Sequence, residues 1–234
     1  MAFGTRLRSV GALPDGGQLL TFELPRPLSV LPGQWFDLEC AGQTRLVAAL
    51  DYSPTESWLS LALPRDQRLG STPLSPGTEC VLDGPHGEGL DADGAMQNTI
   101  IVADPLGLPG LLFLARRGPA AALALVSLEQ TSWLRLRPSR YMLPQMPAGV
   151  IAGLGPLEDA GIPSRASHAE HPGCHDGPLS DLLDAWLAGR PAEDRWQDHA
   201  VVIGETAFVH RIRDLLRGRI GHYRGLTIPG QARK

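Results

Sequence analysis

The segment between His168 and His175 concentrates side chains that can bind a metal ion. Three imidazoles, one carboxylate and one thiol fall within eight residues: His168, Glu170, His171, Cys174 and His175. All three kinds of group are ligands of zinc. The spacing matches no familiar zinc module, however, and Pro172-Gly173 is typical of an exposed loop. The sequence therefore favours a polar loop without a metal ion, and a metal site stays the alternative.

A second segment with binding character follows the apolar run from Thr99 to Ala103 and reads Ala103-Asp-Pro-Leu-Gly107. A glycine-containing loop between a strand and a helix can hold phosphate through free backbone N–H groups. Asp104 works against this because it adds a negative charge, and Pro105 removes one N–H donor. Gly107 either admits a cofactor or permits close packing of the helix on the strand. The loop predicts weak phosphate binding or none.

The overall composition argues against several functions. The 234 residues carry a net charge of −4 with a pI near 6.0, whereas nucleic acid and anionic membrane surfaces attract concentrated Lys and Arg. No Gly-x-Ser-x-Gly elbow supports a serine hydrolase. Apolar runs are too short for a signal peptide or a membrane-spanning helix, so we expect a soluble, cytoplasmic protein.

The three cysteines, Cys40, Cys80 and Cys174, are odd in number and far apart, and no Cys-x-x-Cys pair occurs. This spacing predicts neither a disulfide framework nor a cysteine-ligated cluster within the chain.

The N-terminal part, residues 1–93, reads as short strands between Gly/Pro turns. Five segments have strand character at roughly ten-residue spacing: Gln18 to Leu24, Gln34 to Cys40, Arg45 to Leu50, Trp58 to Leu63 and Glu79 to Asp83. No convincing long helix fits between them. This pattern predicts an antiparallel barrel or sandwich.

The C-terminal part, residues 99–234, follows a polar linker at Asp91 to Asn98 and alternates strands with helices. Strands are expected at Thr99 to Ala103, Ala121 to Leu128, Gly149 to Ala152, Pro163 to Ser167 and Val201 to Gly204. Helices are expected at Leu108 to Arg117, Leu179 to Leu187 and Phe208 to Leu216, where apolar residues recur with helical spacing. The alternation predicts a mostly parallel sheet with helices on its faces.

The order of these pieces resembles the ferredoxin–NADP reductase superfamily, and within it the electron-transfer subunit of dihydroorotate dehydrogenase. Leu31-Pro-Gly-Gln-Trp-Phe36 is similar to the family's Pro-Gly-Gln-Phe strand, and Gly84-Pro-His-Gly87 to its Gly-Pro-x-Gly turn. His175-Asp-Gly-Pro-Leu-Ser-Asp-Leu-Leu183 is similar to a segment of that subunit. The resemblance implies a β-barrel that binds FAD, followed by an α/β domain that binds NAD(P)H.

For FAD, the resemblance implies that Arg45 pairs with the pyrophosphate. Val47 and Ala48 stand where the family has a stacking tyrosine and a serine hydroxyl, so binding is expected to be weakened. The family's second phosphate element corresponds to Gln67-Arg68 or to Gly70-Ser71-Thr72, which makes Arg68 a candidate. The alternative is that Arg45 is an ordinary solvated arginine.

Four glycines are carried over as cofactor-binding candidates: Gly84, Gly87, Gly107 and Gly204. Gly84 and Gly87 are also explained as turn glycines. Gly107 alone matches the family's glycine-rich nicotinamide loop, and Val201-Val-Ile-Gly204 replaces a strand ending in Cys-Gly-Pro. The resemblance therefore implies impaired NAD(P)H binding. Without the family's cysteine tail, it implies no iron–sulfur cluster on this chain.

Two functions follow from this combination. The first is a flavin-dependent oxidoreductase that transfers electrons between NAD(P)H and a protein partner, or works as a homodimer, with the cofactor between the two domains. The cleft between the domains is then expected to be the largest pocket. The second is a non-catalytic binding or regulatory module that keeps the fold while its cofactor sites decay.

Overall fold

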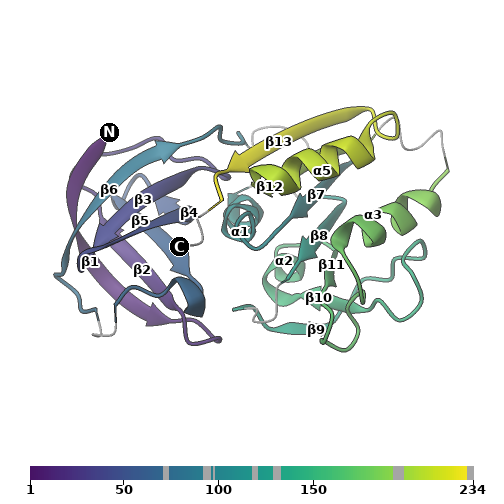
Figure 1. Cartoon of the computed structure of the whole chain (residues 1–234), viewed down its shortest axis with the longest axis horizontal. Helices are drawn as coiled ribbons and strands as arrows, with labels where there is room; N and C mark the ends of the chain where they lie inside the picture. Colours follow the sequence, from purple (N-terminus) through teal and green to yellow (C-terminus); the bar gives the residue numbers. More distant parts are fainter. Residues whose placement is uncertain are drawn as a thin grey trace.

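The computed structural model describes residues 1–70, 74–91, 96, 98–117, 121–128, 133–191 and 198–230. They form an antiparallel β-barrel followed by a parallel sheet with helices (Figure 1). The predicted two-part architecture is confirmed. The boundaries placed at residues 93 and 99 stay a prediction, because residue 93 lies outside the described part. Among the described residues, no helix is long and apolar enough to cross a membrane.

The barrel contains six strands in the spatial order β1-β2-β5-β4-β3-β6, and β6 pairs with β1 to close it. The strands are β1 (Ala2–Ala12), β2 (Gln18–Glu23), β3 (Trp35–Cys40), β4 (Gln43–Ser53), β5 (Trp58–Leu63) and β6 (Glu79–His86), with a short 3-10 helix η1 (Arg65–Gln67). Alternate residues point inward, and Phe22, Phe36 and Leu61 are fully buried in the barrel core.

Cys40 and Cys80 lie opposite each other on β3 and β6 and form a disulfide with a Cα–Cα distance of 4.6 Å. The expectation from the sequence that the cysteines stay unpaired is wrong. The barrel brings together two residues that are 40 positions apart, and the linear spacing gives no sign of this. Cys174 is free and half-buried.

The second part is a five-stranded parallel sheet in the order β11-β8-β7-β12-β13. Its strands are β7 (Thr99–Ala103), β8 (Leu123–Ser127), β11 (Ser164–Ser167), β12 (His199–Glu205) and β13 (His222–Ile228). Its helices are α1 (Leu108–Arg117), α2 (Gly155–Asp159), α3 (Leu179–Ala188) and α5 (Thr206–Leu216). A small hairpin joins β9 (Leu136–Pro138) to β10 (Ala152–Leu154).

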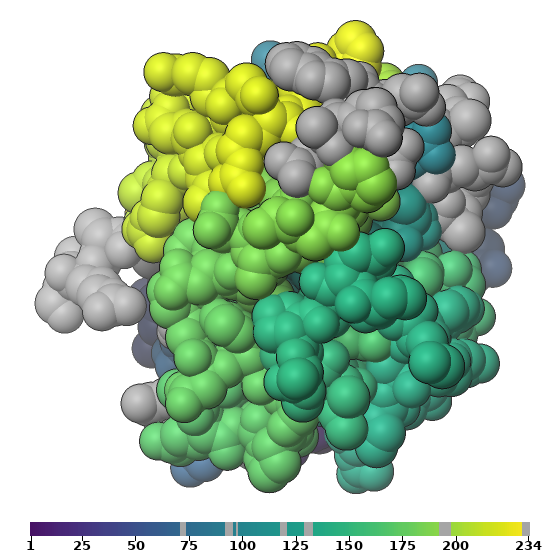
Figure 2. Space-filling model, turned by 90° about the vertical axis from the view of Figure 1, so that its right-hand side faces the viewer, coloured from purple at the N-terminus to yellow at the C-terminus, as the bar shows by residue number. Residues whose placement is uncertain are grey.

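Both faces of the parallel sheet are buried, which explains the continuous apolar run of β7. Ile101 packs in the cluster that contains α1 and α2, whereas Ile100 packs in the cluster that contains α3 and α5. The strand expected at Gly149 to Ala152 lies instead at Ala152–Leu154, because Gly149 has a positive φ of 85° and belongs to a turn. Figure 2 shows the side of this domain that faces away from the barrel.

The two parts meet along α1, which packs against β4. Gly110 of α1 approaches the barrel so closely that a Cβ there would lie 2.9 Å from the Gly33 nitrogen. Arg116 forms an ion pair with Asp51 at 2.5 Å. Phe113 of α1 is fully buried in the barrel core cluster. β13 points its carboxyl end toward the barrel (Figure 1), and its Leu226 touches Gly33.

Candidate functional site

Arg45 lies near the start of β4, beside the turn at Gly70. Its Nη2 donates to Gln43 Oε1 at 3.2 Å, and the Gly70 N–H donates to the same oxygen at 3.2 Å. A guanidinium and a backbone N–H thus meet at one acceptor, and both groups can donate to a phosphate oxygen. Arg68, which precedes Gly70 by two residues in the sequence, is exposed. The alternative residues Ser71 and Thr72 lie outside the described part of the chain.

The next residues of β4 offer nothing to a flavin ring. Val47 is 2% exposed and points into the barrel core, and Ala48 is 6% exposed in the cluster that contains Leu111 and Leu112 of α1. Tyr52, further along β4, is buried and makes its contacts within the chain. Its hydroxyl is hydrogen-bonded to the backbone of Leu28, and Arg117 lies over its ring at 5.6 Å.

Gly84 and Gly87 both pack around the first residues of β3. A Cβ on Gly84 would lie 2.6 Å from Phe36 Cδ1, and one on Gly87 would lie 3.1 Å from Trp35 Nε1. Both have positive φ angles, 150° and 79°, so conformation and packing alone explain these glycines. Trp35 stays partly exposed beside His86, with ring centroids 4.6 Å apart. A Cβ on Gly87 would also lie 3.7 Å from the Thr227 oxygen, so Trp35 lies near the carboxyl end of β13.

Gly107 and Gly204 are brought together at the carboxyl ends of β7 and β12. A Cβ on Gly107 would lie 1.9 Å from Ile203 O, and one on Gly204 would lie 2.4 Å from Asp104 Cγ. Asp104 is 7% exposed. Its Oδ1 accepts the Gly107 N–H at 2.8 Å, and its Oδ2 accepts the Glu205 N–H at 2.7 Å. The position where a ligand phosphate is expected therefore holds a carboxylate of the chain itself.

The pKa of Asp104 is raised to about 6. Burial is the main cause, because it disfavours the charged form. Hydrogen bonds from the backbone of Glu205, Gly107 and Leu106 act in the opposite direction, and the nearby Glu205 carboxylate adds a smaller upward effect. The carboxylate is thus ionised at neutral pH and protonated in mild acid.

The segment from His168 to His175 does not form a metal site in the structure. Among the described residues, no three His, Cys, Asp or Glu side chains are grouped so that they could hold a metal ion. His168 and His171 meet edge to face with centroids 6.0 Å apart. Burial raises the pKa of the Cys174 thiol to about 11, which leaves it protonated and unreactive at neutral pH.

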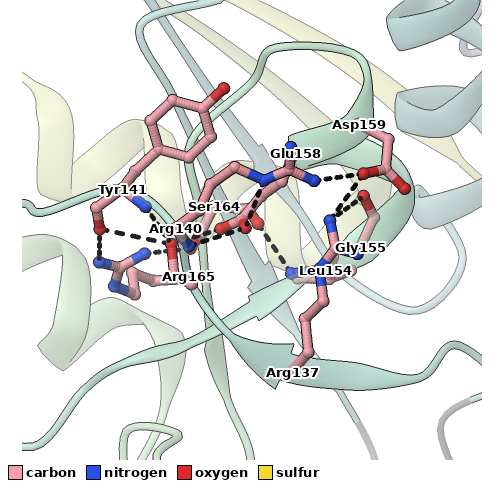
Figure 3. A network of polar contacts seen from close by, with 10 residues as sticks. Arg137, Arg140, Tyr141, Leu154, Gly155, Glu158, Asp159, Ser164 and Arg165 are labelled. Atoms are coloured by element: carbon pink, nitrogen blue, oxygen red, sulfur yellow. Dashed lines mark hydrogen bonds and ion pairs between the residues drawn. The ribbon is translucent and has the colours of Figure 1, made fainter.

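A polar network around Glu158 was not foreseen from the sequence (Figure 3). Glu158 is 1% exposed and accepts hydrogen bonds from the Ser139 hydroxyl and, at 3.2 Å, from the Arg140 N–H. Arg165 is 3% exposed and donates to the backbone oxygens of Val150, Ser164 and Tyr141 at 3.0, 2.7 and 2.6 Å. These bonds tie the chain between β9 and β10 to β11, so the network is structural.

Two pockets lined by described residues lie away from the expected cleft. One, of about 680 Å³, is at an end of the barrel near Cys40, Cys80 and Glu39. A smaller one, of about 200 Å³, is at the amino ends of the parallel strands near His199 and His222. Neither supports the expectation of a dominant pocket between the domains, because α1 packs directly on β4 there.

No protein-family model and no curated protein matches the sequence. Solved structures do match over almost the whole chain. The cytochrome P450 reductase GcoB of Amycolatopsis matches with a TM-score of 0.70 and 15% identity, covering 99% of this chain and 71% of that one. The ferredoxin–NADP⁺ reductase of Plasmodium falciparum, with 2′P-AMP, gives 0.64 and 13%, covering 96% of both chains.

A siderophore-interacting protein of Acinetobacter baumannii matches with a TM-score of 0.61 and 15% identity, over 100% of this chain and 93% of that one. The chain thus has the fold of the ferredoxin–NADP reductase superfamily, as its motifs predict. Its likeness to the dihydroorotate dehydrogenase subunit in particular stays a prediction.

Proposed function

We propose that this chain is an electron-transfer protein of the ferredoxin reductase type that binds a flavin nucleotide weakly and exchanges electrons with a protein partner. The observation that carries the proposal is the convergence of the Arg45 guanidinium and the Gly70 N–H on one oxygen, at 3.2 Å from each. A flavin phosphate that displaced the Gln43 side chain would find both donors in place. The bound flavin would supply the redox chemistry.

The ring end of the flavin fits less well than its phosphate end. Val47 and Ala48 provide neither a stacking ring nor a hydroxyl, and both are buried. Stacking contributes on the order of 1 kcal/mol, and a hydrogen bond contributes about as much. Their joint loss weakens binding roughly thirtyfold, at about 1.4 kcal/mol per factor of ten. We therefore propose substoichiometric flavin that is lost on dialysis.

NAD(P)H does not fit the crevice at the carboxyl ends of β7 and β12. The N–H groups of Gly107 and Glu205 already donate to Asp104, and a second anion beside this carboxylate would be repelled. The electrons of the proposed reaction are therefore not taken from a nicotinamide nucleotide at this position.

The second candidate is a non-catalytic module that keeps the fold. It is favoured by the packing of Ala48 and Leu50 in one apolar cluster with Leu111 and Leu112 of α1. This packing fills the side of β4 that a flavin ring would need.

Titration of the dialysed protein with FAD and with FMN, followed by flavin fluorescence, tests the proposal. We expect saturable binding that Arg45→Ala weakens about tenfold, because a charge-assisted hydrogen bond is lost. Arg211→Ala, at an exposed position on α5, is the matched control and should bind as the wild type does. Absence of binding at high flavin concentration would favour the non-catalytic module. Full occupancy that survives dialysis would contradict the predicted weakening.

A further inference from the structure

Asp104 contacts two loops that are distant in the sequence. One carboxylate oxygen accepts the N–H of Gly107, which precedes α1, and the other accepts the N–H of Glu205, which precedes α5. The backbone adds two further bonds, from the Asp104 N–H to Ile203 O at 3.3 Å and from the Leu108 N–H to Asp104 O at 2.9 Å. Both carboxylate oxygens are therefore used within the chain.

Asp104 holds the turn that leads into α1. Residues 105–107 form a turn, and the helix begins at Leu108. An aspartate side chain can accept a backbone N–H a few residues further along the chain, which stabilises such turns. The bond from the Gly107 N–H to Asp104 Oδ1 at 2.8 Å is of this kind. The carboxylate that impairs a phosphate site therefore stabilises the turn before α1.

The space around the carboxylate is shaped to contain it. A Cβ on Gly204 would lie 2.4, 2.4 and 2.6 Å from Cγ, Oδ1 and Oδ2 of Asp104. Because Gly204 has no side chain, the space beside it accommodates the Asp104 carboxylate rather than an external ligand. Gly107 differs, because its Cβ would meet the backbone oxygen of Ile203 at 1.9 Å whatever residue stands at 104.

We infer that Asp104 is a built-in anion, which takes the backbone N–H groups that this fold offers to a ligand phosphate and joins the β7–α1 loop to the β12–α5 loop. A helix N-terminus attracts an anion through its free N–H groups and its dipole. Here a carboxylate of the chain itself accepts these N–H groups. The crevice is consequently closed to phosphate-bearing nucleotides, and the inference holds whether or not a flavin binds near Arg45.

Chemical rescue tests this inference. Asp104→Gly removes the carboxylate and leaves its donors and its space, so an added anion of similar size should take its place. We expect formate, and less strongly inorganic phosphate, to raise the melting temperature of Asp104→Gly saturably by about 3 °C or more, the shift typical for one restored polar interaction in a chain of this size. The wild type in formate and the variant in chloride at equal ionic strength are the controls. An equal rise in the wild type, or no rise in the variant, would overturn the inference.

A double-mutant cycle provides a second test that needs no ligand. Gly204→Ala should destabilise the wild type but have little effect in the Asp104→Gly background, because the clash with Asp104 has gone. Gly107→Ala is the matched control, and its cost should be the same in both backgrounds. If Asp104→Gly does not fold, Asp104→Ser, which removes the clashing carboxylate, replaces it as the background. A Gly204→Ala cost that does not depend on residue 104 would contradict the inference.

Discussion

At the scale of single residues, the two segments that the resemblance assigns to ligands carry different side chains. On β4, Val47 and Ala48 are apolar and buried. In the β7–α1 loop, the Asp104 carboxylate accepts two hydrogen bonds from the backbone. The sequence reveals these residues, but it shows only what they cannot do for a cofactor. The positive role of Asp104 depends on Glu205, which is distant in sequence and becomes a neighbour only in the folded sheet.

The raised pKa of Asp104 predicts a pH-dependent stability. The folded-state pKa of about 6 lies above the ordinary value of 3.8, so the folded protein binds this proton more tightly than the unfolded chain. The stabilising contribution is complete below about pH 4 and is lost as the pH rises through 6. The total loss across this window is about 3 kcal/mol, taking about 1.4 kcal/mol per unit of pKa difference.

Urea unfolding of the wild type and of Asp104→Asn at pH 4.5 and pH 8 measures this effect. The neutral amide does not titrate, so the stability of Asp104→Asn relative to the wild type should be greater at pH 8 than at pH 4.5. Comparing the two proteins at each pH removes the contributions of other groups, such as Asp159, whose pKa is lowered by hydrogen bonds from Arg137 and Arg140. A difference that is the same at both pH values would show that Asp104 does not titrate in this range.

At the scale of elements, segments with a strong local pattern are predictable and segments set by pairing are not. The bounds expected for β5, β7 and α1 agree with the structure, because apolar periodicity and turn residues define them locally. β1, β9 and β13 were not expected. β1 alternates charged and apolar residues only in part, and it is held by its neighbours β2 and β6. β13 is fixed by seven residue pairs with β12.

The network around Glu158 predicts how the β9–β10 hairpin is held. Glu158→Ala would leave the Ser139 hydroxyl and the Arg140 N–H without their buried acceptor. We expect a loss of about 3 kcal/mol and faster proteolysis within residues 139–151. The neighbouring Asp159→Ala is the control, since its ion pairs with Arg137 and Arg140 are exposed and should contribute little to stability. Equal effects of the two substitutions would argue against a structural role for the buried carboxylate.

At the scale of the whole molecule, α1 belongs to both domains at once. It connects β7 to β8 in the parallel sheet, yet its Phe113 is fully buried in the barrel core together with Phe36 and Leu61. Arg117 adds to this contact, because its guanidinium donates a hydrogen bond to the backbone oxygen of Tyr52 in β4. Because one helix contributes to two cores, loss of either core removes support from the other. The wild type is therefore expected to unfold in a single cooperative transition.

Phe113→Ala should separate the two domains thermodynamically. Removal of a buried phenylalanine costs about 3 to 5 kcal/mol, and this loss falls on the contact that couples the barrel to the α/β domain. Calorimetry should then show two transitions, with the barrel unfolding first. Leu182→Ala, which truncates a fully buried residue of α3 within the α/β domain, is the control and should lower one shared transition without dividing it. A single transition in Phe113→Ala, merely shifted to lower temperature, would mean that the other contacts between α1 and β4, including the ion pair of Arg116 with Asp51, are sufficient to keep the domains coupled.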